Sequence, residues 1–222
     1  MTEHMQREID KLKKRLLSLC WIVEERFRQA VKSIEKRDAD LAQKVIEADA
    51  EIDRIEVNVE EECLKILALH QPVAIDLRFI ITTLKINNDL ERVGDLAVNI
   101  AERSKFLAGQ PKVDVPFDFA SMAEKTQSML RRSLEALVNM DCKLAYKVCA
   151  ADDEVDEMNR QMYLMVQDAI CAHPQQTASL IHLLSVSRHL ERIADSATNI
   201  AEDVIYMVEG KIIRHKAEDY KP

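Results

Sequence analysis

Two segments of this chain carry the same oxygen-bearing side chains at the same spacing. Residues 90–102 and residues 190–202 are identical at nine of their thirteen positions. A repeat of this length indicates two copies of one structural unit. Because they recur every three or four residues, the shared acids and amides fall on one stripe of a helix. They are Glu91, Asp95, Asn99 and Glu102 in the first copy, and Glu191, Asp195, Asn199 and Glu202 in the second.

A pair of aspartates recurs upstream of each segment. The pairs are Asp49 and Asp53 in the first copy and, 103 residues later, Asp152 and Asp156 in the second. Side chains four residues apart are neighbours on a helix, with about 5–6 Å between their Cβ atoms. In an antiparallel helix hairpin that turns at Pro72, Asp53 lies 19 residues before the turn and Glu91 lies 19 residues after it. We therefore expect the four acids of each copy to meet at one height.

Four carboxylates that meet in a partly buried place cannot all stay ionised without compensation. Either some of them bind a proton, or cations neutralise them. Oxygen ligands suit hard or borderline ions such as magnesium, calcium, manganese and iron, and bridging carboxylates can hold more than one ion. The sequence therefore predicts two metal sites, made by Asp49, Asp53, Glu91 and Asp95, and by Asp152, Asp156, Glu191 and Asp195.

A solvated helix surface is the alternative interpretation, because acids four residues apart are common on exposed helices. The pattern of divergence between the copies favours a metal site. Glu56 and Glu60 are replaced by Asn159 and Tyr163 in the second copy, whereas both aspartates of the pair are kept. The weaker candidates, expected either beside the ligands or on the plain helix surface, are Asn99, Glu102, Asn199 and Glu202.

No motif for nucleophilic catalysis or for phosphate binding occurs in the sequence. There is no Gly-x-Ser-x-Gly and no P-loop, and the chain contains only three glycines. The six histidines share no common spacing, so we expect them in turns, on the surface or in ordinary packing. These features predict a protein that is not an enzyme.

Helical periodicity accounts for most of the chain. Glycine and proline number only 3 and 5, which helices tolerate and turn-rich β folds do not. Apolar residues at steps of three and four predict three helices in each half, over about 9–34, 41–66, 76–107, 118–140, 141–172 and 175–209. The expected fold is all-α, with two tandem three-helix bundles related by internal duplication. We place these domains at residues 1–108 and 117–215, on either side of the breaker-rich segment 109–116.

The third helix of each half should turn one stripe toward its bundle. In the first half this stripe begins with Leu77, Ile81 and Leu84 and continues into the acids from Glu91. The adjacent stripe is small and apolar, and it comprises Leu90, Gly94, Ala97 and Ala101, matched by Leu190, Ala194, Ala197 and Ala201. Because small side chains let helices approach closely, we expect the carboxylates beside a packed seam.

Composition and charge exclude several classes of partner. The net charge is −8, and no basic stripe is interleaved with aromatic residues, so nucleic acid is excluded as a partner. The apolar stretches are too short to cross a bilayer, and residues 1–14 lack the apolar core of a signal peptide. The five cysteines are odd in number and have no zinc-binding spacing, which is typical of a reducing compartment. We expect a cytoplasmic protein without membrane insertion.

The repeated segments 90–102 and 190–202 resemble the motifs of the PhoU family. The likeness continues through residues 203–215 and through residues 69–78 at the entry to the third helix, so that it covers nearly the whole chain. Members of this family are tandem three-helix bundles, the fold also expected from periodicity. One departure is Ala194, where the family motif usually has glycine, and it leaves the expected ligand positions intact.

The resemblance implies a cytoplasmic regulator of bacterial phosphate transport and phosphate homeostasis, acting as a homodimer. It would link the ATP-binding subunit of the high-affinity phosphate transporter to a sensor histidine kinase. Its part in signal transduction would be negative regulation of the phosphate-starvation response when phosphate is plentiful. Some members hold multinuclear metal clusters at Glu/Asp-x-x-x-Asp motifs, which here match the eight carboxylates named above. The implied cofactors are metal ions in such clusters, of iron, manganese, zinc or magnesium.

Two other functions stay open. The first is a carboxylate-bridged multinuclear metal protein for iron or manganese storage or for redox chemistry, which needs an open coordination position. The absence of histidine among the acids departs from the Glu-x-x-His motif of di-iron bundles and weighs against it. The second is a plain helical scaffold whose acids are solvated.

Overall fold

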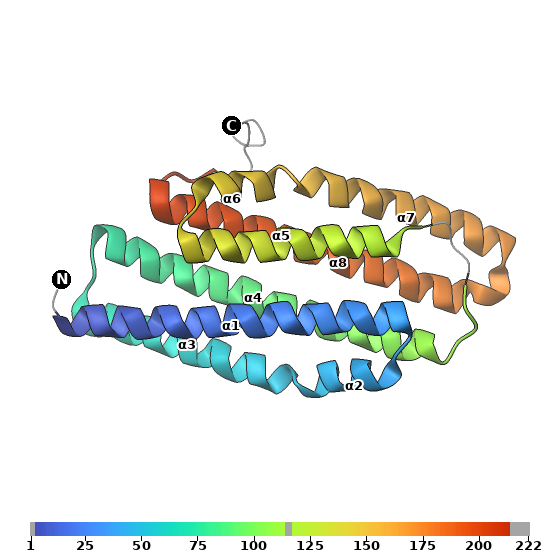
Figure 1. Ribbon diagram of the computed structural model, residues 1–222, viewed down its shortest axis with the longest axis horizontal. Coiled ribbons are helices and arrows are strands. Elements are labelled where there is room, and N and C mark those ends of the chain that lie inside the picture. The colour runs from blue at the N-terminus through green and yellow to red at the C-terminus, as the bar shows by residue number, and fades with distance from the viewer. Residues whose placement is uncertain (1–2, 114–116, 214–222) are drawn as a thin grey trace.

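A computed structural model of the chain describes residues 3–113 and 117–213, and every regular element within these ranges is a helix (Figure 1). The first half contains α1 (Glu3–Lys36), α2 (Ala39–Glu47), α3 (Asp49–His70) and α4 (Ala74–Ala108). The second half contains α5 (Phe119–Asn139), α6 (Cys142–Cys149), α7 (Asp152–Ala172), the one-turn 3-10 helix η1 (Pro174–Gln176) and α8 (Thr177–Glu209). The all-α class and the repeated order of helices are confirmed.

The long helices form because each has one continuous apolar face. In α1 the side chains of Leu12, Leu19, Val23 and Phe27 recur at helical spacing and are at most 1% exposed. They pack toward α3 and α4, and burial of each such side chain contributes about 1.5–3 kcal/mol. Aspartate caps begin three of the helices, with carboxylates that accept from backbone N–H groups: Asp38 from Leu41, Asp118 from Ser121, and Asp141 from Leu144.

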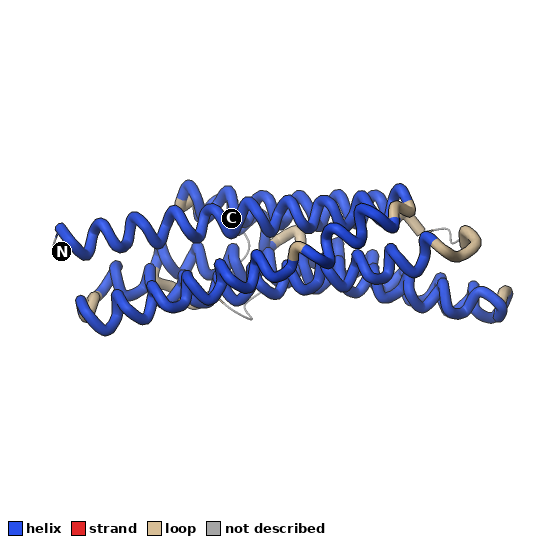
Figure 2. Tube along the Cα trace, turned by 90° about the horizontal axis from the view of Figure 1, so that it is seen from below, coloured by secondary structure: helices blue, strands red, loops and turns tan. Residues whose placement is uncertain are grey.

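The two halves pack against each other mainly along α4 and α8. These helices run antiparallel through the centre, with α1 to α3 on the side of α4 and α5 to α7 on the side of α8 (Figure 1). A second view shows an elongated body whose helices run close to its long axis (Figure 2). Polar contacts join the halves: Lys85 Nζ lies 3.4 Å from Asp203 Oδ1, and Asn199 Nδ2 donates to Asp89 Oδ1 at 3.2 Å.

The predicted second helix of each half is wrong in one respect, because it is broken into two. Ala48 ends α2 by bonding its N–H to the carbonyl of Val45, and α3 begins directly afterwards at Asp49. In the second half the break falls at 150–151, between α6 and α7. Neither break contains glycine or proline, so the usual breaker signals are missing. The local signal is acidic side chains in the first turn of α3 and α7, where the helix dipole favours negative charge.

The inward stripe predicted for the third helix is also wrong. Leu77 and Ile81 on α4 are 39% and 37% exposed, and the acids that follow them lie on the same flank. The reason is that α4 is covered from two sides, by α1 and α3 and by α8, so its buried face is the neighbouring stripe. That small, apolar stripe is packed as predicted, with Leu90, Ala97, Ala101, Ala194 and Ala197 at most 2% exposed.

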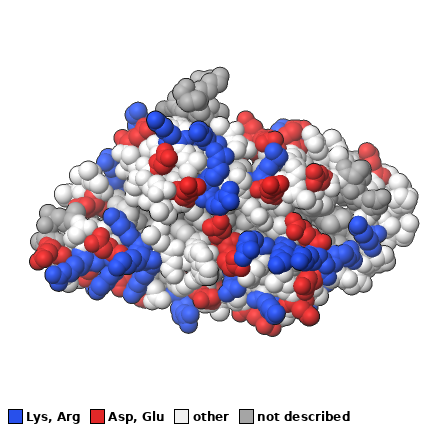
Figure 3. Space-filling model, viewed as in Figure 1, with Lys and Arg blue, Asp and Glu red and all other residues white. Residues whose placement is uncertain are grey.

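The surface carries charges of both signs in alternation. Figure 3 shows Lys and Arg side chains mixed with Asp and Glu side chains over one face of the molecule. Among the described residues, no helix combines the length and the apolar character needed to cross a bilayer. The limits predicted for the two domains stay a prediction, and their outermost residues 1, 2, 214 and 215 lie outside the described part of the chain.

Candidate metal centres

The duplicated carboxylates gather at the two helix breaks. We define the N-cluster as Asp49, Asp53, Glu91 and Asp95, on α3 and α4, and the C-cluster as Asp152, Asp156, Glu191 and Asp195, on α7 and α8. Asp49 and Asp152 are the first residues of α3 and α7. Each cluster therefore lies beside the point where the second helix of its half is interrupted.

Acids of the N-cluster from both helices affect one another electrostatically. Burial raises the pKa of Asp49, and the carboxylates of Asp53 and Asp95 raise it further. The pKa of Glu91 is raised by burial and then by Asp95, Glu56, Asp53 and Asp49. The hairpin thus brings the acids of α3 to the acids of α4, as the distances from Pro72 predict. Asp53 and Asp95 themselves are exposed, so this cluster is open to solvent.

Glu56 lies beside the N-cluster and interacts with two of its acids, although it was not among the residues predicted from the repeat. Its pKa is raised by burial and by the carboxylates of Glu60 and Asp53, and it acts in turn on Glu91. Asn87 Nδ2 donates to the Glu56 backbone carbonyl at 3.0 Å and lies 3.3 Å from its Oε1. The predicted ligands were the acids shared by both copies, and Glu56 was not among them because the second copy has Asn159 at this position. The signal that could have found it is its position one turn beyond Asp53 on the same face of α3.

The C-cluster is tighter and more buried. One carboxylate oxygen from each of Asp152, Asp156 and Asp195 lies within 4.8 Å of the other two, and within the described residues the N-cluster has no such trio. Burial, followed by the charges of Asp195 and Asp156, raises the pKa of Asp152 to about 7. The pKa of Asp195 is raised by burial and by Asp156. Burial, Asp195 and Asp156 likewise raise the pKa of Glu191.

The C-cluster borders a cleft between the two halves, and α4 forms its opposite wall. This cleft has a volume of about 670 Å³ and is lined by Asp152 and Asp195 together with Lys85, Asn88 and Arg92 of α4. The positive charges of Arg92 and Arg192 oppose the rise in the pKa of Asp195. Among the residues that the structure describes, no cation has a comparable effect on the pKa of Asp49 or Glu91 in the N-cluster. The two clusters thus share ligand types but differ in electrostatic surroundings.

The weaker candidates do not behave alike in the two halves. Asn99 Nδ2 donates to the backbone carbonyl of Asp95 at 2.9 Å within α4, whereas Asn199 donates across to Asp89. Glu102 is exposed, with Oε2 3.4 Å from Arg103 Nη1. Glu202 is only 8% exposed and lines the cleft beside the C-cluster. Of the four, Glu202 is therefore placed best to act near an ion.

The donor set fits a cation. Asp152 Oδ1 is buried and has no hydrogen bond of good geometry among the described residues, although the Thr198 hydroxyl lies near enough to lower the pKa of Asp152. A buried oxygen without a well-aligned partner costs free energy. Several acids in each cluster have raised pKa values, first because they are partly buried and then because their charges repel. A divalent cation would satisfy the Asp152 oxygen and remove this repulsion. All of the converging ligands are oxygen atoms, which favours hard ions.

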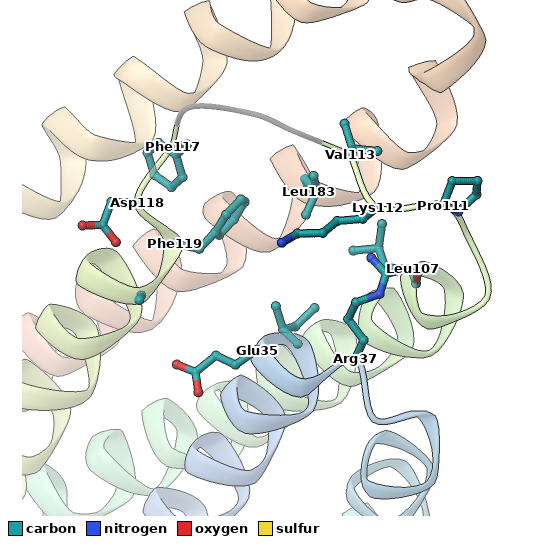
Figure 4. Close-up of a pocket in the computed structure, with 12 residues that line it drawn as sticks. Glu35, Arg37, Leu107, Pro111, Lys112, Val113, Phe117, Asp118, Phe119 and Leu183 are labelled. Carbon is teal, nitrogen blue, oxygen red and sulfur yellow. Dashed lines mark hydrogen bonds between the residues drawn. The ribbon is translucent and has the colours of Figure 1, made fainter.

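A second large cavity lies at the linker and contains none of these acids. Its volume is about 620 Å³, and its lining includes the apolar residues Leu107, Phe117, Phe119 and Leu183 together with the charged side chains of Glu35, Arg37, Lys112 and Asp118 (Figure 4). Arg37 donates hydrogen bonds to the backbone carbonyls of Leu107 and Gln110, so its charge is used in holding the end of α4. This cavity has a mixed apolar and charged lining, and it contains none of the acids of the two clusters.

Comparison with known proteins gives a consistent result over both halves. The family model described as "PhoU domain" matches residues 16–104 and again residues 119–204. A curated protein of Aquifex aeolicus (strain VF5), named phosphate-specific transport system accessory protein PhoU homolog, is 38% identical over 210 residues, covering 95% of each chain. A protein of the same name from Clostridium acetobutylicum is 34% identical, covering 93% of this chain and 94% of the relative.

Solved structures agree with the sequence matches. The crystal structure of PhoU from Pseudomonas aeruginosa superposes with a TM-score of 0.89 at 34% identity, covering 93% of this chain and 99% of that one. The crystal structure of the phosphate transport system regulatory protein PhoU from Streptococcus pneumoniae gives a TM-score of 0.83 at 26% identity, covering 94% and 98%. The matches span both helical repeats and therefore both clusters of acids.

Proposed function

Because the chain belongs to the PhoU family, we propose that it is an accessory regulator of phosphate transport. In this role it joins the ATP-binding subunit of a phosphate transporter to a sensor histidine kinase in the cytoplasm. It restrains the kinase when phosphate is plentiful, and it works as a homodimer without catalysing a reaction. The observation that carries the proposal is similarity to PhoU accessory proteins over about 95% of the chain, including both acid motifs.

The proposal includes divalent cations at both clusters. Asp49, Asp53, Glu91 and Asp95 would hold one group of ions, and Asp152, Asp156, Glu191 and Asp195 the other. The ions would supply positive charge that neutralises these acids and fastens α3 to α4 and α7 to α8. The buried Asp152 Oδ1, which lacks a well-aligned hydrogen bond, and the converging oxygens of Asp156 and Asp195 support this part of the proposal.

A binding experiment tests the adaptor role. The purified chain is mixed with the phosphate transporter ATP-binding subunit and with the cytoplasmic part of the kinase from the same organism, and complexes are isolated by size exclusion. We expect a complex with each partner, and none with the ATP-binding subunit of a transporter for another solute. If the chain discriminates neither partner from that control, the adaptor role is wrong.

Metal analysis separates the regulator from the storage or redox alternative. A regulator should hold a fixed, small number of ions per chain and leave them unchanged in air. An iron store or redox centre should take up excess ferrous iron and oxidise it when oxygen is admitted, which visible absorption detects. Rapid oxidation that disappears in Asp95→Ala and Asp195→Ala would favour the alternative.

A further inference from the structure

A group of metal-ligating side chains unlike the carboxylate clusters lies at the far end of the first hairpin. His70 is the last residue of α3, and His4 and Glu8 occupy successive turns of one face of α1. We propose that His4, Glu8 and His70 form a third cation site, selective for borderline divalent ions of the zinc type. It is separated from Asp53 by 17 residues of α3, or about 25 Å of helix.

The three side chains converge on a common point. His70 Nε2 lies 2.7 Å from Glu8 Oε2, and His4 Nε2 lies 3.7 Å from Glu8 Oε1. One ligand atom from each residue falls within 4.8 Å of the other two. Tetrahedral zinc with bonds of about 2.0–2.1 Å requires ligand atoms roughly 3.3 Å apart. Since His4 is 73% exposed on the first turns of α1, its ring can close the remaining distance.

Burial of the carboxylate at the centre of the group calls for positive charge. Glu8 is 5% exposed, and a buried carboxylate is rarely found without a charged partner. Lys65 is a competing partner, with Nζ 3.4 Å from Glu8 Oε1, but its side chain is 51% exposed and can turn to solvent. A cation between the two imidazoles and Glu8 would bind Oε2, at the position now taken by the hydrogen bond from His70.

Ligand chemistry separates this site from the two clusters. Two imidazole nitrogens and one carboxylate oxygen suit zinc and cobalt, whereas all-oxygen groups suit magnesium, calcium and manganese. The exposed side of His4 leaves room for water as a fourth ligand. The chain would therefore sort ions between unlike sites by the type of donor atom.

The internal repeat shows why this site occurs once. His173 occupies the position that corresponds to His70, 103 residues later, at the end of α7. The first helix of the second half, α5, begins only at Phe119, which corresponds to Leu16. The turns of α1 that carry His4 and Glu8 therefore have no counterpart beside His173. The proposed ion would fasten these additional turns to the end of α3.

Cobalt titration of the full chain tests the site. The protein is prepared without a histidine tag, stripped with chelator and saturated with magnesium to occupy the oxygen clusters. Cobalt is then added at pH 7.5, and the visible d–d absorption of a low-coordinate nitrogen-ligated ion is followed. We expect one equivalent per chain, displaced by zinc, and at least tenfold weaker binding in His4→Gln and in His70→Gln. The matched control His173→Gln and the exposed-surface control Asp168→Asn should bind as the wild type does.

Hydrogen exchange gives a local reading of the same event. Zinc should slow exchange of the amides in the first three turns of α1 in the wild type and in His173→Gln, but not in His4→Gln. Because His4 is exposed, its replacement leaves the fold intact even if His70→Gln disturbs it. Cobalt absorption that persists in both His4→Gln and His70→Gln would overturn the proposal, as would the absence of any such band at 100-fold excess of metal.

Discussion

Among the acids of the C-cluster, Asp152 has the most strongly raised pKa. Its burial and the charges of Asp195 and Asp156 raise its pKa to about 7, whereas Asp49 at the equivalent position has a smaller rise. The difference follows from enclosure, since α4 closes the C-cluster from one side and the N-cluster is open. If the C-cluster holds a cation, this one carboxylate would link ion binding to the dependence of stability on pH.

The metal-free protein should lose stability as the pH rises from about 4 to about 7. In this window the unfolded state has already released the proton of Asp152, whereas the folded state retains it until about pH 7. We expect Asp152→Asn to remove this loss and to raise the free energy of unfolding at pH 8 by about 1–2 kcal/mol, a value reduced because solvent screens a half-buried group. Urea unfolding of chelated protein at several pH values measures the difference.

His189 also changes the stability of the protein with pH, so the effect of Asp152 must be measured as the difference between Asp152→Asn and the wild type. Burial lowers the pKa of His189 to about 4, so its contribution to stability is lost as the pH falls from about 6.5 to about 4, opposite in sign to that of Asp152. The histidine is present in both proteins and cancels in their difference. Should Asp152→Asn fail to stabilise the chelated protein at pH 8, the electrostatic description of this residue is wrong.

Helices α3 and α4 meet through a glycine that has a partner of matched size. A Cβ atom on Gly94 would lie 3.0 Å from Ile52 Cδ1 and 3.3 Å from Cγ2, so alanine does not fit without movement. In the second half the corresponding residues are Ala194 and Val155, a larger residue facing a smaller one. The exchange of a small and a large residue between the two copies indicates that the two pairs fill a similar space in complementary ways.

This pairing predicts a double-mutant coupling. Ile52→Val alone should cost about 0.5–1.5 kcal/mol, and Gly94→Ala alone should be close to neutral because a clash offsets its gain in helix propensity of about 1 kcal/mol. Together they reproduce the residues of the second half, and we expect a favourable coupling of about 1 kcal/mol. Thermal or urea unfolding of the four proteins gives this value, and strict additivity would contradict it.

The whole molecule is organised around the antiparallel pair α4 and α8. Because of this pairing, Arg92 from the first half acts on Asp195 in the second, and Lys85 pairs with Asp203. Cations at the clusters would link helices within each half, while the α4 and α8 contact links the halves. Cation binding at one cluster would therefore stabilise both halves against unfolding.

Chelation should lower the melting temperature by several degrees. Each 1 kcal/mol corresponds to about 2–4 °C in a chain of this size, and ions bound only by the folded state contribute according to their affinity. With manganese as the probe, Asp95→Ala and Asp195→Ala should each remove part of the shift, and the double variant should remove all of it. The exposed Asp168→Ala serves as control. Equal melting temperatures with and without chelator in the wild type would count against metal binding.

The fold could be predicted from sequence wherever periodicity and repetition act together. The long helices, the small buried stripe and the meeting of Asp53 with Glu91 follow from local spacing and one turn. The breaks after Ala48 and before Asp152 could not be predicted, because neither has a glycine or proline and the break depends on packing. Arg92 was expected to act on acids of a neighbouring helix and does so, but that this helix is α8 of the other half depends on how the halves dock.

Part of the candidate site required the structure for the same reason. Glu56 was set aside by the comparison of copies, and His4 and His70 are 66 residues apart with no shared spacing. The sequence predicts the ordinary surface or turn role for both histidines, yet their rings lie 5.6 Å apart. Whether the end of one helix contacts the start of another depends on where each helix begins and ends. Hydrophobic periodicity predicts these limits only to within about one turn.

Because the helices are interrupted beside Asp49 and Asp152, the short helices α2 and α6 end directly next to the acid clusters. In an uninterrupted helix, a bound cation could not change the direction of the preceding turns. The breaks allow the angle between α2 and α3, and between α6 and α7, to depend on what the acids bind. Cations bound at the clusters would fix the angle at each break. A protein that binds α2 or α6 would then meet a helix whose orientation is either fixed or variable. If the clusters hold cations, the location of the acids would make the rigidity of each break depend on cation content, and a protein bound to α2 or α6 would respond to that rigidity.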